Sequence, residues 1–299
     1  MKKLTGHIQA LACAVIFSFH YILAKEVTPL VDLIAFASAR GIVGGLLLIA
    51  INYRYIARIC DKKTILQLTL ICLFSFVFNQ MLFLGGIIRT TSSQAAMLSN
   101  FIPVTTYLVA LVFKNRSFSA SKIVLLLVQF LALILYFYWQ YQVDLSTNFL
   151  GNAMILANVF SLAIGLNLVE KSALKNLPSS LMTGSLLLLA GIILGALQSF
   201  DYTSLQSYMA SSNRAVFILF FEVVVATSFA YYLNFDAARR IGAAYTSQYA
   251  FFQVPLTSGF VFLLFGDTIS TATIALFFLV FICNMIDWSL NNRRFFGRH

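Results

Sequence analysis

Long apolar stretches, separated by short polar segments, run through almost the whole chain. Ten of them fit the pattern, at approximately 7–25, 32–52, 64–86, 92–113, 121–140, 149–169, 180–200, 214–235, 242–265 and 270–289. A helix needs roughly 20 mostly apolar residues to cross a bilayer. The stretches are continuously apolar and do not alternate in polarity over ten-residue segments, so they predict membrane-spanning helices and not the strands of a barrel. The first stretch follows Met1-Lys2-Lys3, but no small-residue cleavage site with a soluble domain comes after it, and we interpret it as a span.

The composition leads to the same class of protein. Hydrophobic residues make up 60% of the 299 residues and charged residues only 10%, whereas soluble domains have about 45–50% and about 25%. The 20 Lys and Arg residues are spread along the chain and form no basic stripe, so nucleic acid is excluded as a partner. The predicted fold class is an all-α integral membrane protein with ten transmembrane helices, and its first partner is the lipid bilayer.

The positions of the basic residues test this count of spans. If the N-terminus is cytoplasmic, the segments on that side contain 16 of the 20 basic residues: Lys2, Lys3, Arg54, Arg58, Lys62, Lys63, Lys114, Arg116, Lys122, Lys171, Lys175, Arg239, Arg240, Arg293, Arg294 and Arg298. Only Lys25, Arg89 and Arg214 fall on the other side, and Arg40 falls within a span. Basic residues concentrate in cytoplasmic loops. Both termini are therefore predicted to be cytoplasmic.

The two halves of the chain resemble each other. An offset of 152 residues superposes 84–118 on 236–270 and brings Pro103 onto Pro255. Each half, 1–143 and 144–299, would contain five spans, so the second half enters the membrane in the opposite orientation. The basic loop around Arg54 then corresponds to 201–213, which has no basic residue, as opposite orientation requires. Inverted five-span repeats are typical of transporters that alternate access to a site near the midplane.

Short motifs in the first two spans match a known family. The family's first span has the pattern W-G-x-N-x-x-x-x-K, and Phe17, Ser18, His20 and Lys25 occupy its Trp, Gly, Asn and Lys positions. The hydrophobic-Arg pattern of the family's second span is matched by IAFASAR, which ends at Arg40.

Further along the chain, Pro103 and Pro255 match the proline-centred fourth and ninth spans of the same family. Gly266-Asp267 matches the Gly-Glu turn that follows the ninth span, whereas Lys114-Asn115 replaces the acidic residue in the first half. The chain resembles a bacterial permease of the drug/metabolite transporter superfamily, built from two EamA-type five-helix repeats.

This resemblance implies several properties. It implies secondary transport across the bacterial cytoplasmic (inner) membrane and a central cavity lined mainly by spans 3, 4, 8 and 9. The resemblance does not imply a substrate, because members of the family move amino acids, sugars, nucleotides and drugs. We expect a small organic metabolite, either an amino acid or related amphipathic compound, or a drug-like molecule that is exported. No enzymatic activity, cofactor or metal is expected, a proton is the candidate coupling ion, and the protein is expected to be a monomer or a homodimer.

Two helical faces are the candidates for the cavity wall. Residues three and four apart share a helix face, and polar groups within a span are costly unless they face a cavity or a partner helix. The predicted substrate-binding residues are Ser93, Met97, Asn100 and Tyr107 on span 4, Tyr245, Gln248, Tyr249 and Phe252 on span 9, and Asn79 on span 3. Packing between helices, with polar side chains as interhelical hydrogen-bonding groups, is the alternative for the same residues.

Three ionisable residues within spans are the candidates for coupling or for an ion pair. Glu222 is interpreted as the only acidic residue deep within a span, and it could couple protons, hold an amine of the substrate, or pair with Arg40 at a similar depth. His20 could shuttle protons or could be a structural histidine bonded to a neighbouring helix. Pro103 and Pro255 offer kinks or hinges at matching places in the two halves.

The same residues bear on two competing functions, an intramembrane enzyme and a passive channel. A metal site needs clustered His, Cys or carboxylates, and the three histidines lie at 7, 20 and 299. Neither an acidic dyad nor a Gly-x-Ser-x-Gly nucleophile motif is found, which disfavours an intramembrane enzyme. A passive channel or facilitator could use the same polar stripes and stays open as the alternative. The four cysteines show no close-set pair, and the Gly44-Gly45 and Gly85-Gly86 pairs indicate close helix packing.

Overall fold

The structure, a computed structural model, describes residues 2–27, 29–90, 92–141, 148–172, 174–266 and 270–296. Within these ranges the chain forms helices joined by short connections, and there is no strand. The all-helical fold class expected from the continuous apolar stretches is confirmed.

The first half of the chain begins with two long helices, and its third and fourth spans are each divided into shorter pieces. The elements are α1 (Lys2–Val27), α2 (Leu33–Ile51), the 3₁₀ helix η1 (Tyr53–Ile59), α3 (Lys62–Cys72), the π-helical segment η2 (Leu73–Val77), α4 (Phe78–Ile87), α5 (Ser92–Ser99), α6 (Ile102–Val112) and α7 (Ala120–Tyr141).

The second half of the chain also begins with two long helices. Its elements are α8 (Phe149–Lys171), the short 3₁₀ helix η3 (Leu174–Asn176), α9 (Ser179–Leu197), α10 (Thr203–Ser211), α11 (Asn213–Phe220), the π-helical segment η4 (Phe221–Phe229), α12 (Ala230–Ile241), α13 (Ala243–Gln248), the 3₁₀ helix η5 (Tyr249–Phe252), α14 (Gln253–Phe265) and α15 (Thr271–Phe296). The hydrophobic pattern did not predict α10, which lies in the polar segment 201–213.

Eight helical stretches among the described residues are long and apolar enough to cross a membrane. Two further apolar helices, Met97–Val112 and Thr271–Asp287, are shorter and coincide with the predicted fourth and tenth spans. The multi-pass helical architecture is therefore confirmed, whereas the number of ten spans stays a prediction.

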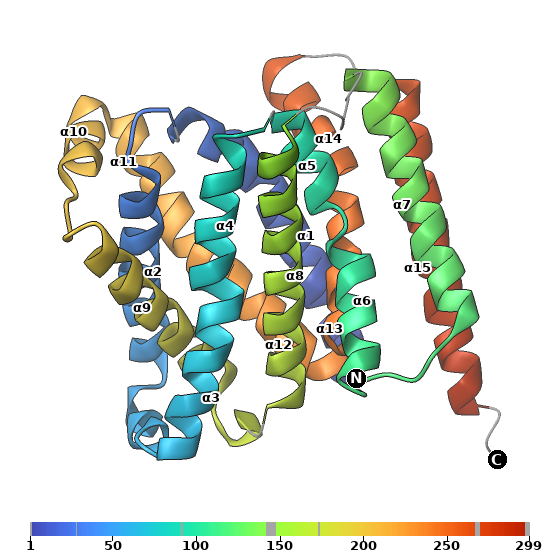
Figure 1. The fold of residues 1–299 in the computed structure, drawn as a ribbon, viewed down its shortest axis with the longest axis horizontal. Coiled ribbons are helices and arrows are strands. Elements are labelled where there is room, and N and C mark those ends of the chain that lie inside the picture. The colour runs from blue at the N-terminus through green and yellow to red at the C-terminus, as the bar shows by residue number, and fades with distance from the viewer. Residues whose placement is uncertain are drawn as a thin grey trace.

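Connections alternate between the two ends of the bundle (Figure 1). The start of α1, the end of α15 and the connections α2–α3, α6–α7, α8–α9 and α12–α13 all lie toward the lower side of Figure 1. These are the segments that contain most of the basic residues of the chain. The start of α1 and the end of α15 therefore lie on the same side of the bundle, as the cytoplasmic assignment of both termini requires.

Helices α2 and α9 cross at glycines. A Cβ atom added to Gly45 would lie 2.7 Å from the carbonyl oxygen of Gly184, and one added to Gly191 would lie 2.5 Å from the backbone nitrogen of Ile42. Contacts this short leave no room for a side chain, so the backbones themselves are in contact. The expected close approach at the Gly44-Gly45 pair is confirmed.

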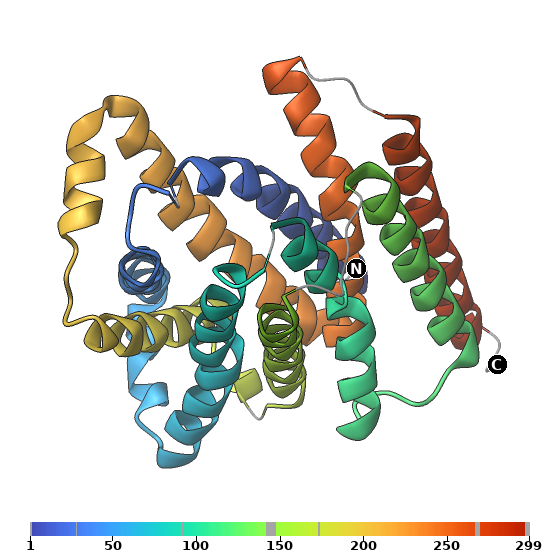
Figure 2. The same cartoon turned by 45° about the horizontal axis from the view of Figure 1, so that its top comes forward.

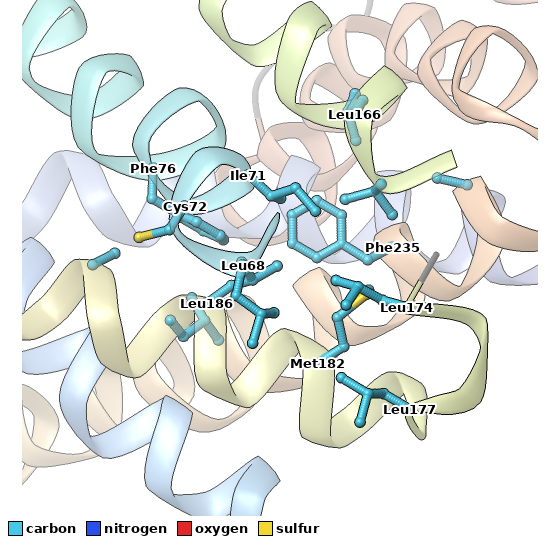
Figure 3. Packing of buried hydrophobic residues seen from close by; sticks show 14 of the residues in the cluster. Leu68, Ile71, Cys72, Phe76, Leu166, Leu174, Leu177, Met182, Leu186 and Phe235 are labelled. Carbon is cyan, nitrogen blue, oxygen red and sulfur yellow. The ribbon is translucent and has the colours of Figure 1, made fainter. Parts of the chain in front are cut away.

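Two large hydrophobic clusters join helices from both halves of the chain. Figure 3 shows the first, in which Leu68, Ile71 and Cys72 of α3 pack with Met182 and Leu186 of α9 and with side chains of η2, α8 and α12. The second joins α5, α6, α7, α13, η5 and α15. Figure 2 shows α7 and α15 side by side at one edge of the molecule, next to α14.

Candidate functional site

The predicted spans 4 and 9 are interrupted at corresponding positions. In the first half α5 ends at Ser99 and α6 begins at Ile102, with Pro103 in its first turn. In the second half the 3₁₀ segment η5 covers Tyr249–Phe252 before α14, which contains Pro255. With the offset of 152, residue 100 corresponds to 252, so both interruptions directly precede the superposed prolines. The hinge positions expected from Pro103 and Pro255 are therefore real breaks in helical geometry.

The predicted spans 3 and 8 contain widened, π-helical segments. η2 covers Leu73–Val77, and adding 152 gives 225–229, which falls within η4 (Phe221–Phe229). π-helical turns cost hydrogen-bond geometry and are frequent at functional sites. The hydrophobic pattern gave no signal for them, because apolar periodicity does not distinguish a π turn from an α turn over so short a segment.

A charged group lies buried at the start of η4. The Glu222 side chain is fully buried, and its carboxylate lies 2.7 Å from Nδ1 of His20 on α1 and 3.2 Å from an Nη atom of Arg40 on α2. The side chains of His20 and Arg40 are partly exposed, at 17% and 15%, whereas the side chain of Glu222 has no exposed surface. The three coupling or ion-pair candidates thus form one group that joins three helical elements.

Hydrogen bonds of the π-helical segment hold Arg40 in place. Nε of Arg40 donates to the hydroxyl of Thr227 over 2.6 Å, and this hydroxyl donates to the backbone carbonyl of Glu222 over 2.7 Å. Ser228 donates to the carbonyls of Val223 on its own segment and of Gly44 on α2. The widened segment therefore supplies side-chain partners for its own carbonyls and fixes α2 against η4.

The chemistry open to this group follows from its charges. The guanidinium of Arg40 places one positive charge beside the Glu222 carboxylate. Protonation of His20 would place a second positive charge beside this one carboxylate and would raise the net charge of the group by one. Binding or release of a proton would therefore change how strongly Glu222 holds Arg40.

A cavity of about 550 Å³ lies closer to the start of α1 than His20 and its partners do. It is lined by Leu4, His7, Leu11, Val15, Tyr245, Gln248, Tyr249, Phe252, Leu256, Phe277, Phe281, Asn284, Met285 and Asp287. Its walls are α1, the segment from α13 through η5 to α14, and α15. His20 lies five residues beyond Val15, which corresponds to about 7.5 Å along the axis of α1.

The four candidates of span 9, Tyr245, Gln248, Tyr249 and Phe252, all line this cavity. The hydroxyl of Tyr249 lies 3.0 Å from Nδ1 of His7, a histidine that the sequence interpretation left without a role. That these side chains bind a substrate stays a prediction.

The other candidates lie elsewhere. Met97 and Tyr107 are packed in the second hydrophobic cluster, where the Tyr107 hydroxyl accepts a hydrogen bond from the backbone nitrogen of Ser119. Asn100 is buried at the break between α5 and α6. The amide group of Asn79 pairs with the backbone of Asn158 on α8, and the side chain of Ser93 lies outside the described residues, as does Asp267 of the family turn.

Besides Glu222, which stays the predicted acid deep within a span, two acids at the ends of predicted spans are buried. Asp287 on α15 is 6% exposed and lies 2.7 Å from Nζ of Lys122, which is itself 5% exposed on α7. Asp236 on α12 is 5% exposed and pairs with Arg240. Lys122, which the sequence placed among the basic residues of the cytoplasmic side, is buried because α7 begins at Ala120 and its first turn packs against α15.

Ionic contacts also close the end of the bundle where α1 begins. Arg116, in the α6–α7 connection, lies 3.1 Å from Glu170 on α8 and donates to the carbonyl of Ile241. The other carboxylate oxygen of Glu170 accepts from the backbone nitrogen of Ala243 at the start of α13. These bonds fix the turn at Gly242, whose φ of +95° favours glycine, between α8 and the α6–α7 connection. Among the described residues no three His, Cys, Asp or Glu side chains form a cluster that could hold a metal ion.

Comparisons with known proteins agree with this architecture. Among solved structures, 28 chains match, and one described only as "Crystal structure of protein" superposes with a TM-score of 0.78 over 96% of this chain and 98% of its own, at 10% sequence identity. At that identity the similarity shows the fold alone. No curated protein matches the chain. Residues 4–138 match the family model described as the EamA-like transporter family. The first half of the chain is therefore similar to the EamA-like transporter family, and the long apolar helices of the described residues agree with a multi-pass membrane protein.

Proposed function

We propose that the protein is a secondary carrier that moves a small organic metabolite across the bacterial inner membrane by alternating access. Ten spans in two inverted halves, 1–143 and 144–299, with both termini in the cytoplasm, are part of this proposal. The paired helix breaks before Pro103 and Pro255 and the paired π-helical segments support it, because they place two deformable positions at corresponding points of the two halves.

The observation that carries the proposal is the buried group of Glu222, His20 and Arg40. Ionisable residues within membrane spans are expensive to keep, and they commonly mark ion or proton pathways. Glu222 has no acidic equivalent at Leu70, so the acidic member of the group belongs to the second half alone.

The proposed coupling ion is a proton, held between His20 and Glu222. When His20 is neutral, the carboxylate is balanced by Arg40 alone. When His20 is protonated, the carboxylate is shared by two cations, which weakens its hold on Arg40 and therefore the contact between α2 and η4. Proton binding would then favour one of two arrangements of the helices, as coupling requires.

The test begins with untargeted metabolite profiling of cells with and without the protein. The compounds that change are then supplied to proteoliposomes containing the full chain. We expect Glu222→Gln to abolish uptake driven by a proton gradient while the variant is still expressed and folded. Glu26→Gln is the matched control, because Glu26 forms an exposed pair with Arg214 at the surface. Uptake by this variant should be unchanged.

The same vesicles distinguish a carrier from a channel. A carrier gives a flux that saturates and shows counterflow, whereas a channel gives ohmic conductance. Normal uptake by Glu222→Gln would remove the proton-coupling role. Alanine variants of Tyr249 and Asn100 test the substrate site, and an unchanged apparent affinity in both would place that site elsewhere.

A further inference from the structure

The cavity beside α1 is bordered by apolar side chains that face outward. Leu11 and Val15 on α1 and Phe281 and Met285 on α15 line the cavity and are also exposed. In a membrane-spanning bundle, exposed apolar side chains face the acyl chains. Since α13, η5 and α14 form the back of the cavity between these two helices, the cavity opens sideways into the lipid between α1 and α15.

The inner wall of the same cavity carries polar groups. Gln248 is 2% exposed, its Oε1 accepts a hydrogen bond from Lys122 over 3.2 Å, and its Nε2 has no partner among the described residues. Asp287 lines the cavity next to it and is bonded to the same lysine. An unpaired buried donor costs free energy that a bound acceptor would recover.

The charges around Gln248 restrict the chemistry of a ligand. Lys122 and Asp287 compensate each other over 2.7 Å, so the wall has no net charge there. A cationic head would compete with Lys122 for the carboxylate, and an anionic head would be repelled by it. An uncharged head with an oxygen that accepts from Gln248 and a hydroxyl that donates to Asp287 satisfies both groups.

We propose that this lateral cavity binds an uncharged single-chain amphiphile that enters from the bilayer, with its hydroxylated head at Gln248 and Asp287 and its chain between α1 and α15. The inference extends the proposed carrier function by naming a class of bound molecule and its route of entry. Two sources share this chemistry: a membrane lipid that stays bound, and a cargo that is moved.

The experiment uses a monoacylglycerol carrying a photoreactive diazirine in its acyl chain, added to proteoliposomes that contain the full chain. After illumination, the labelled peptides are identified by mass spectrometry. We expect saturable labelling of the α1 and α15 residues that line the cavity, and competition by unlabelled monoolein. Labelling that does not saturate, or that follows exposure over all lipid-facing helices, would overturn the proposal.

Variants locate the head and the chain separately. Gln248→Leu removes the unpaired donor and should raise the half-saturating probe concentration about three- to tenfold, the effect of one lost hydrogen bond. Gln129→Leu, a buried glutamine of α7 that does not line the cavity, is the matched control. Leu11→Trp, at an exposed position on the cavity rim, should block labelling without affecting folding, whereas Ile8→Trp, exposed on α1 but not lining the cavity, should not.

The remaining measurements separate the outcomes. Equal labelling of Gln248→Leu and the unchanged chain, or stronger competition by dodecylamine or dodecanoate than by monoolein, would contradict the assigned head chemistry. Protein-dependent transfer of the bound probe between leaflets identifies a cargo, and its absence with saturable labelling identifies a bound lipid; both support the site. Labelling that persists in vesicles with no metabolite flux would refute the carrier function alone.

Discussion

The contact between Arg40 and Glu222 gives a prediction with a definite magnitude. Glu222→Gln removes the only carboxylate within 4 Å of Arg40 among the described residues, and Arg40 keeps its bond to Thr227. Breaking a buried ion pair by removing one partner costs about 3–5 kcal/mol, because the other charge is left uncompensated. Arg40→Gln should cost a similar amount. The double variant has no uncompensated guanidinium or carboxylate, so it should cost clearly less than the sum, with a coupling free energy of about 2–3 kcal/mol.

This coupling is measured from the free energy of unfolding of the four proteins in mixed micelles of detergent and SDS. The matched control cycle uses Glu26→Gln and Arg214→Gln, whose exposed pair should give a coupling of about 0.2–1 kcal/mol. Additive effects of the Arg40 and Glu222 substitutions, to within about 0.5 kcal/mol, would show that the two charges do not depend on each other and would refute the reasoning.

Three further predictions concern orientation, packing and the second buried ion pair. Cys60 is the one exposed cysteine and the other three are buried, so a membrane-impermeant maleimide should label the native protein from the cytoplasmic side only; labelling from outside would reverse the predicted orientation. Gly45→Leu should lower the melting temperature strongly because its added atoms meet the backbone of Gly184, whereas a leucine at Gly259, which has open space, should be tolerated. Lys122→Met should lower the free energy of unfolding by about 3–5 kcal/mol, since Asp287 stays buried without its cation. Adding Asp287→Leu should restore part of the lost stability, and a double variant less stable than Lys122→Met would contradict this.

The sequence predicted the helical architecture well, because its signal is long and repeated. A span is an average over about 20 residues, so single polar residues do not hide it, and the positions of Arg40 and Glu222 stand out against an apolar background. Their shared depth suggested an ion pair, which is present in the structure. That His20 joins the same group could not be derived, since a helical pattern gives the face of a residue but not the neighbouring helix that it meets.

The burial of Lys122 could not be predicted from the sequence, for a physical reason. A basic residue near the end of a span is equally consistent with a cytoplasmic turn and with a buried first turn, because only a partner on another helix decides between them. That partner, Asp287, lies 165 residues further along the chain and near the end of its own span, where acids are common. The lateral cavity could not be predicted for the same reason, since its polar wall depends on how α7, α13 and α15 meet.

The two π-helical segments are held by different forces, and this difference decides which one can respond to a proton. η2 is fixed by close packing, since a Cβ atom added to Gly165 of α8 would lie 2.8 Å from the backbone nitrogen of Ser75. η4 is joined to α2 by hydrogen bonds of Thr227 and Ser228, but its contacts with α1 and α2 also depend on the charges of Glu222 and its partners, which protonation would change. Removing the charge in Glu222→Gln should therefore increase amide hydrogen exchange at 221–229 and leave exchange at 73–77 unchanged. An equal increase in both segments would mean that they open together, and the asymmetry between the two halves would then have no role in coupling.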